Sequence, residues 1–171
     1  ATAGHKETIT EAYEQHLISN QTLCEIGDFY DCDYIFLCTP VRRNIDYLRQ
    51  LKGKIKPGCI ITDVGSVKTD IHEEVIKLDM EDCFIGGHPM AGSEKTGLNN
   101  ANEYLLENAY YILTPTAKTD TVRLEGLRSL VTQLGAIALV LDYHLHDYAT
   151  AAISHLPHII AYSLVNLVKK S

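Results

Sequence analysis

The chain is organised around the segment Gly86-Gly87-His88-Pro89-Met90-Ala91-Gly92-Ser93-Glu94, which follows a short β-prone run. Glycine permits close backbone approach and positive φ, so we expect the strand to stop at the two glycines and to leave His88 beside a cleft. Pro89 lacks an N–H group and disfavours helix at the preceding residue, which predicts an extended turn at His88. An imidazole with the Ser93 hydroxyl and the Glu94 carboxylate nearby is typical of an acid–base site. The alternative is a surface loop whose histidine only hydrogen-bonds its neighbours.

Before and after this segment, patterns typical of strands and helices alternate with short connections. Apolar runs that suit buried strands lie at residues 33–38, 59–64, 83–85, 109–114 and 136–141. Apolar residues at helical spacing lie at residues 5–17, 41–51, 66–78 and 121–134. This alternation predicts an α/β fold with a parallel sheet and helices on both of its faces.

Ser66 stands at the start of one of these expected helices, directly after a strand that ends at Val64. The simplest role for a serine there is that of an N-cap, whose hydroxyl accepts a hydrogen bond from a backbone N–H two or three residues further on. A helix start at the carboxyl end of a parallel strand is also where such sheets bind anions and cofactors. Capping and cofactor binding are therefore both open for Ser66.

From Asp142 onward the pattern changes to a long helix with a wide apolar face. We therefore place one domain at residues 1–141 and the start of a second domain at residues 142–171. Another domain or another subunit is needed to cover such a face. Pro157 lies inside the helix and is expected to kink it, because its ring clashes with the preceding turn.

Histidines on this helix raise the question of a zinc site: His144, His146, His155 and His158. A metal site needs three or four convergent ligands with supporting hydrogen bonds. These histidines are spread over roughly four helical turns. We therefore predict no metal, and a structural or substrate-facing role for these side chains.

Composition narrows the class of protein. The 171 residues include 22 acidic and 15 basic side chains, for a net charge of −7, which argues against a nucleic-acid-binding surface. No uninterrupted apolar run approaches the roughly 20 residues that span a bilayer, and no secretory signal is recognisable at the amino end. The five cysteines form no C-x-x-C pair, which is typical of a reducing, cytoplasmic setting. We expect no nucleic-acid and no membrane partner.

A glycine-rich G-x-G-x-x-G turn is absent from the sequence, and no strand precedes the first expected helix. A dinucleotide-binding fold uses that first βα turn to hold the cofactor's pyrophosphate. Either the protein is not a dinucleotide enzyme, or the chain begins after the first strands of such a fold.

Motifs spread over the chain separate these two possibilities. In order along the sequence they are Asp33-Tyr34-Ile35-Phe36-Leu37-Cys38-Thr39-Pro40-Val41, Asp63-Val64-Gly65-Ser66-Val67-Lys68, the glycine–histidine segment that starts at Gly86, and Ser154-His155-Leu156-Pro157-His158. Together they closely resemble prephenate dehydrogenase, the NAD-linked enzyme family of tyrosine biosynthesis. The resemblance covers essentially the whole chain. Its second and third motifs are specific as a pair, whereas the first alone would fit many nucleotide-binding folds.

The resemblance implies a Rossmann-type domain, incomplete at its amino end, followed by the start of an all-helical dimerisation domain and hence a homodimer. It implies NAD as cofactor, with NADP as the alternative, and oxidation of prephenate with loss of carbon dioxide to give 4-hydroxyphenylpyruvate. His88 would accept the proton of the ring hydroxyl, and Ser66 would orient His88. The residues that it places around the cofactor are Cys38, Thr39, Pro40 and Ser66. Those that it places around the substrate are Ser93, Glu94 and His158.

Three alternatives accompany this interpretation. Arogenate dehydrogenase carries out the same chemistry on a substrate with an amino group in place of the keto group. Other β-hydroxyacid-type dehydrogenases use a catalytic lysine on the interdomain helix, where this chain has histidines. The third alternative is a non-catalytic regulatory or dimerisation module of the same fold. Because the glycine-rich turn and most of the helical domain are missing, we expect the 171-residue chain alone to bind NAD poorly and to be inactive.

Overall fold

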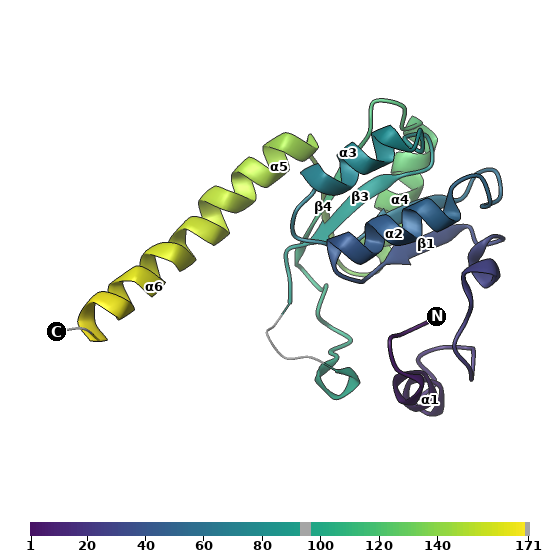
Figure 1. Cartoon of the computed structure of the whole chain (residues 1–171), viewed down its shortest axis with the longest axis horizontal. Helices are drawn as coiled ribbons and strands as arrows, with labels where there is room; N and C mark the ends of the chain where they lie inside the picture. Colours follow the sequence, from purple (N-terminus) through teal and green to yellow (C-terminus); the bar gives the residue numbers. More distant parts are fainter. Residues whose placement is uncertain (93–96, 170–171) are drawn as a thin grey trace.

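The computed structural model describes residues 1–92 and 97–169, apart from the side chain of His155. Within these residues the chain forms a twisted sheet with helices on its faces and a long helix that projects away from it (Figure 1). The strands are β1 (Tyr34–Leu37), β2 (Ile60–Asp63), β3 (Ile85–Pro89), β4 (Tyr110–Pro115) and β5 (Ile137–Val140). The α/β class predicted from the alternating pattern is confirmed.

The strands pair as a two-stranded set, β1-β2, and a three-stranded set, β3-β4-β5. β1 pairs with β2 and β4 with β5 in parallel, and a single parallel bridge between Ile61 and Phe84 joins β2 to β3. β3 and β4 are antiparallel, so the prediction of a wholly parallel sheet was wrong at this pair. The reason lies in their connection, which in its described residues contains only the short 3₁₀ helix Leu98–Asn100. A parallel connection usually crosses over through an α-helix, and the described part of this one contains none, so the chain returns antiparallel beside β3.

Helices cover both faces of the sheet, as the pattern predicted. They are α2 (Val41–Leu51), α3 (Thr69–Lys77) and α4 (Thr121–Gln133), together with the 3₁₀ helix Ile26–Phe29. The first helix, α1 (Lys6–Glu14), belongs to neither of the two apolar clusters of the sheet. α2 and α3 pack with β1 and β2 in one apolar cluster, and α4 packs with β3 and β4 in another. The adjacent residues Ile60 and Ile61 belong to different clusters, because neighbouring side chains of a strand point to opposite faces.

The glycine–histidine segment does not end the strand, contrary to the sequence-based expectation. β3 runs through Gly86, Gly87 and His88 to Pro89, and its residues pair with β4 over this whole length. The glycines serve close packing: a Cβ atom on Gly87 would lie 2.5 Å from the backbone oxygen of Asp63. Glycine inside a strand marks such close approach of a second backbone. His88 is therefore held on a rigid strand in the interior of the molecule and not on a turn.

We expect Gly87→Ala to destabilise the protein by about 1–3 kcal/mol, because the added methyl group meets backbone that cannot rotate away. Urea denaturation of the full-length gene product would measure the change in the free energy of unfolding. Gly27→Ala is the matched control, since its nearest neighbouring atom would lie at an ordinary 3.9 Å. Equal effects of the two substitutions would contradict this account of the strand.

The carboxyl-terminal segment is one continuous helix that leaves the body of the molecule (Figure 1). It consists of α5 (Tyr143–Thr150), a π-helical stretch (Ala151–His155) and α6 (Leu156–Lys169). The π-helical stretch ends two residues before Pro157, where the sequence predicted a kink. Such bulges accommodate an interrupted hydrogen-bond ladder.

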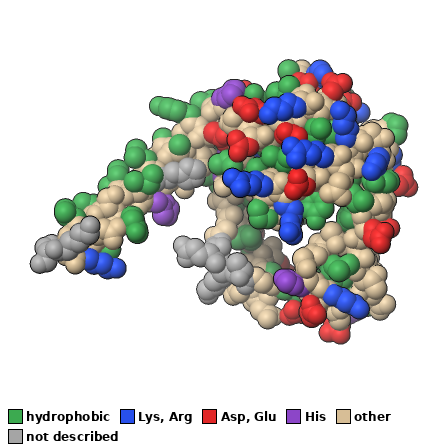
Figure 2. Space-filling model, in the orientation of Figure 1, with side chains coloured by type: hydrophobic (Ala, Val, Ile, Leu, Met, Phe, Trp, Pro, Cys, Tyr) green, Lys and Arg blue, Asp and Glu red, His purple; other side chains and the backbone are tan. Residues whose placement is uncertain are grey.

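Apolar side chains cover this helix and are exposed (Figure 2). By length and composition alone, residues 143–169 could cross a membrane, although they contain no uninterrupted apolar run of that length. The core helix of a soluble domain passes the same test. Within the described residues, the structure shows that the α6 part of this helix buries none of its side chains, so its apolar surface needs a cover.

Candidate active site

Ser66 and His88, the two residues that the sequence singled out for catalysis, line the same hollow. Its volume is about 320 Å³, and its lining consists of Ser66, His88, Pro89, Met90, Ala91, Gly92, Thr150 and Ser154. The last two residues belong to the carboxyl-terminal helix, so the hollow lies where this helix leaves the sheet. Residues of the sheet and its loops thus meet residues of the carboxyl-terminal helix around an imidazole and several hydroxyl groups.

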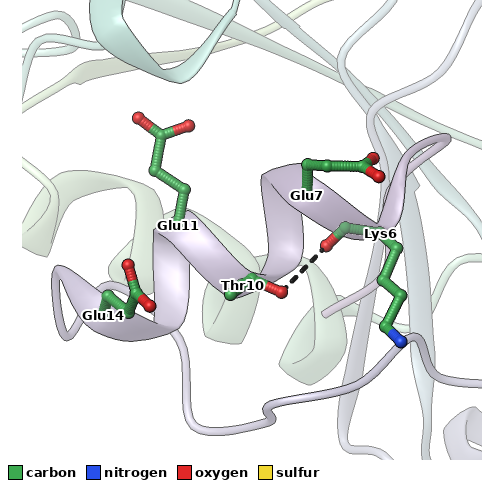
Figure 3. Close-up of a pocket in the computed structure, with 5 residues that line it drawn as sticks. All are labelled: Lys6, Glu7, Thr10, Glu11 and Glu14. Atoms are coloured by element: carbon green, nitrogen blue, oxygen red, sulfur yellow. Dashed lines mark hydrogen bonds between the residues drawn. The ribbon is translucent and has the colours of Figure 1, made fainter.

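A larger hollow, of about 460 Å³, lies elsewhere, along the exposed side of α1 (Figure 3). Its lining comes from that single helix and consists of Lys6, Glu7, Thr10, Glu11 and Glu14. The one hydrogen bond drawn among them joins the Thr10 hydroxyl to the Lys6 carbonyl, at 3.3 Å. No second element contributes to this lining, and we assign it no role.

His88 is held by a second histidine, which comes from α5. The Nδ1 atom of His88 lies 2.8 Å from Nε2 of His146, and the two rings meet edge to face with centroids 5.0 Å apart. His146 is fully buried, and its Nδ1 atom lies 2.8 Å from Oδ1 of Asp147. The sequence placed His146 among possible metal ligands, whereas the structure places it behind the candidate base. Residues 88 and 146 are 58 positions apart, and no local pattern could have joined them.

Asp147 also caps the helix that Ser66 was expected to cap. α3 begins at Thr69, and its first backbone N–H groups, those of Lys68 and Thr69, donate to the Asp147 carboxylate at 2.8 Å each. The Thr69 hydroxyl donates to the same carboxylate at 2.6 Å. The N-cap assignment of Ser66 was therefore wrong, because a carboxylate from α5 occupies that role. Ser66 lies in the preceding loop, where its hydroxyl contributes to the hollow.

These hydrogen bonds keep Asp147 ionised. Burial alone would raise the pKa of the Asp147 carboxyl, but the bonds from Thr69, His146 and Lys68 outweigh it and lower the pKa. The carboxylate thus acts only as an acceptor, at the start of a helix whose dipole favours negative charge.

The loop predicted to line the cofactor lies at the carboxyl end of β1 and contains Cys38, Thr39 and Pro40. Asn44, which sequence reasoning missed, holds this loop: its Oδ1 atom accepts from the Thr39 backbone at 3.2 Å, and its Nδ2 atom donates to the Leu37 carbonyl at 3.1 Å. Asn44 is fully buried although it is polar. The available signal was its spacing of four residues from Leu48, which puts an amide on the apolar face of α2.

A buried ion pair lies beneath the site and was also missed. Asp63 and Lys68 form it with both side chains fully buried. Asp63 accepts further hydrogen bonds from the backbone N–H of Gly65, at 2.9 Å, and of Gly87, at 3.1 Å. Burial lowers the pKa of Lys68, and the Asp63 carboxylate opposes this effect. One carboxylate therefore ties the end of β2 to the Ser66 loop and to the residue before His88.

Of the three residues predicted to bind substrate, the structure describes only His158. Ser93 and Glu94 lie outside the described residues. His158 is exposed on α6, and its Nδ1 atom contacts the Ser154 carbonyl at 2.8 Å, one helical turn from the lining of the hollow. Within the part of the chain that the structure describes, no three His, Cys, Asp or Glu side chains are grouped as metal ligands. Apart from Ser93 and Glu94, the predicted residues thus lie in or near the hollow and at the end of β1.

The sheet, the loops at the carboxyl ends of β1 and β2, and the buried histidine pair define a nucleotide-binding α/β domain of the Rossmann type with the start of a helical domain attached. Residues 2–140 match the family model described as the prephenate dehydrogenase nucleotide-binding domain, and residues 142–171 match that of the prephenate dehydrogenase dimerization domain. The chain belongs to the prephenate dehydrogenase family.

Individual relatives agree with this assignment. The prephenate dehydrogenase of Bacillus subtilis is 42% identical over 136 residues, which cover 77% of this chain and 36% of that protein. The crystal structure of Synechocystis arogenate dehydrogenase matches with a TM-score of 0.86 and 37% identity, over 97% of this chain and 59% of that one. Prephenate dehydrogenase from Aquifex aeolicus, solved with hydroxyphenyl propionate and NAD⁺, matches with a TM-score of 0.86 and 32% identity, over 97% and 58%. The chain spans less than half the length of these curated relatives.

Proposed function

We propose that the gene product containing this chain is an NAD-dependent prephenate dehydrogenase of tyrosine biosynthesis, which converts prephenate to 4-hydroxyphenylpyruvate and carbon dioxide. The observation that carries this proposal is the shared hollow of His88 and Ser66, backed by His146 and Asp147. An imidazole held by a second polar group is the arrangement that general-base catalysis requires. Family membership narrows the substrate to a cyclohexadienol of the prephenate type.

The described residues fit the nicotinamide end of the cofactor. The carboxyl ends of β1 and β2 meet at the site, where α/β sheets of this kind bind their ligands. Thr39 and Pro40 form a loop pinned by Asn44, and Cys38 stands at its start. The cofactor, when bound, supplies the acceptor for the hydride. Cys38, Thr39, Pro40 and Ser66 would hold its nicotinamide end, and NADP stays an alternative to NAD.

The residues of the chain then supply the proton chemistry and the alignment. His88 accepts the proton of the ring hydroxyl, and Ser66 contributes a hydrogen-bonding group beside it. We propose that His158 contacts the substrate, and Ser93 and Glu94, which lie outside the described residues, are the further candidates for substrate binding. Loss of the ring carboxylate makes the product aromatic, so the protein has mainly to align the reacting groups and hold the base.

We also propose a homodimer and a cytoplasmic location. The match of residues 142–171 to a dimerization domain supports the first, and the exposed apolar helix α6 supplies a surface that a second subunit would cover. The five free cysteines support the second, because reduced thiols are usual in the cytoplasm.

The proposal is tested by NADH formation in the full-length gene product, with prephenate and arogenate compared at equal concentrations. We expect turnover of prephenate with NAD. A preference for arogenate, favoured by the similarity to the Synechocystis enzyme, would change the substrate but not the chemistry. Absence of turnover with either substrate, together with no binding of NAD or NADP, would overturn the proposal in favour of a non-catalytic module.

A further inference from the structure

We propose that His146 and Asp147 are positioning residues that fix the tautomer of His88, so that its proton lies on Nδ1 and its lone pair on Nε2. This inference rests on the proposed function, in which His88 is the base. It concerns two residues of the helix that follows β5, neither of which sequence reasoning placed at the active site.

Asp147 fixes the direction of these hydrogen bonds, because it can only accept. Its Oδ1 atom already accepts from the Lys68 backbone, and its Oδ2 atom accepts from the backbone and the hydroxyl of Thr69. An ionised carboxylate has no proton to donate. The Nδ1 atom of His146, which lies 2.8 Å from Oδ1, must therefore carry the hydrogen of this contact.

The direction of the His146–Asp147 hydrogen bond in turn fixes the direction of the hydrogen bond between His146 and His88. A neutral His146 that is protonated on Nδ1 has its lone pair on Nε2, and this atom lies 2.8 Å from Nδ1 of His88. His88 must donate in that contact, so its Nδ1 atom carries a hydrogen. The Thr150 hydroxyl also approaches Nε2 of His146, at a longer 3.5 Å, and a hydroxyl can adapt its direction to either arrangement.

The tautomer of His88 decides which of its ring nitrogens can act as the base. A neutral imidazole protonated on Nδ1 can accept a proton only at Nε2. When the substrate hydroxyl gives up its proton, the O–H bond breaks, an Nε2–H bond forms and the ring becomes an imidazolium. The positive charge of this imidazolium is then connected, through the hydrogen bond to His146, to the Asp147 carboxylate. The opposite tautomer would present an N–H donor to the same hydroxyl and could not act as a base.

The arrangement also couples the base to the position of the second domain. His88 belongs to β3, whereas His146 and Asp147 belong to α5 and the same carboxylate caps α3. Movement of α5 away from the sheet would separate the His88–His146 contact and the helix cap together.

The test compares His146→Gln with His146→Asn in the full-length gene product, labelled with ¹⁵N-histidine. Long-range NMR correlations report which ring nitrogen of His88 is protonated. The glutamine amide oxygen can take the place of Nε2 and accept from His88, whereas the asparagine amide takes the place of Nδ1 and is too short to reach that ring. His144→Asn, an exposed neighbour on the same helix, is the matched control.

We expect the Nδ1–H tautomer of His88 in the unmodified protein, in His146→Gln and in His144→Asn. In His146→Asn we expect the Nε2–H tautomer and a kcat about 100-fold lower, with little change in KM, since the base is lost while the hollow persists. An Nε2–H tautomer in the unmodified protein, or no change of tautomer in His146→Asn, would overturn the inference. A tautomer switch in a protein that turns over neither prephenate nor arogenate would support the inference and overturn the proposed function instead.

Discussion

Replacing His88 with asparagine lowers kcat for prephenate oxidation by about 100-fold or more in the full-length gene product, with a smaller change in KM. Asparagine can still form a hydrogen bond from the position of Nδ1, so the contact with His146 has a replacement. It has no group that takes a proton from the substrate hydroxyl. Because β3 is paired along its length on the β4 side, the substitution should leave the strand in place. NADH formation measured at varied prephenate concentration separates the two kinetic constants.

The matched control is His5→Asn, because His5 is exposed in the loop before α1 and its side chain caps nothing. It should leave both kinetic constants unchanged. Equal activity of the His88 and His5 variants would mean that the histidine on β3 is structural, and the base would have to be sought elsewhere. A raised KM with unchanged kcat would make His88 a binding residue only.

The order of strands and helices could be predicted from the sequence because each element carries its own local signal. The apolar runs around Ile35, Ile61 and Ile112 became β1, β2 and β4, and the helical spacing of Leu48 and Leu51 became α2. The antiparallel direction of β3 against β4 had no such signal. In its described residues the connection between these strands contains no α-helix, and no residue pattern announced this. The glycines of β3 were interpreted as the end of a strand, whereas they permit close contact with a neighbouring backbone.

The candidate site could be predicted in part, for a similar reason. His88 and Ser66 were found through motifs, and both line the hollow. The groups that hold them are long-range partners: Asp147 lies 78 positions from the helix start that it caps, and His146 lies 58 positions from the ring that it contacts. Ser66 was assigned to the cap because a serine before a helix is the usual local solution. Because the Asp147 carboxylate of α5 caps the helix instead, the Ser66 hydroxyl is available to line the hollow.

Removing one partner of the buried ion pair below the site should cost more stability than breaking any other charged contact described above. We expect Lys68→Met to lower the free energy of unfolding by about 3–5 kcal/mol, because it leaves the Asp63 charge buried without a counter-charge. The two backbone N–H groups that donate to Asp63 would remain, at Gly65 and Gly87. They cannot replace a full positive charge. Urea denaturation of the full-length gene product would measure the loss.

A second variant separates the lost charge from the lost packing. In the double variant Asp63→Asn with Lys68→Met, the asparagine oxygen can still accept from one backbone N–H and no buried charge remains. We therefore expect the double variant to be more stable than Lys68→Met alone, although both members of the ion pair have been replaced. If the double variant is the less stable of the two, packing around the lysine stem and not the charge accounts for the effect.

An exposed ion pair provides the stability control for Lys68→Met, and the pKa of the neighbouring His72 reports whether Lys68 is charged. Lys118→Met removes the partner of Asp79 and Glu81 at the surface, where the half-exposed lysine is screened by solvent, and should lower the stability only slightly. His72 is buried beside Lys68, and its pKa is lowered to about 4, mainly by burial and next by the charge of Lys68. Removing that charge in Lys68→Met should raise the pKa of His72, which NMR titration would detect. An unchanged His72 pKa, with a loss of stability no larger than that of Lys118→Met, would mean that Lys68 carries no charge in the folded protein and that Asp63 needs no counter-ion there.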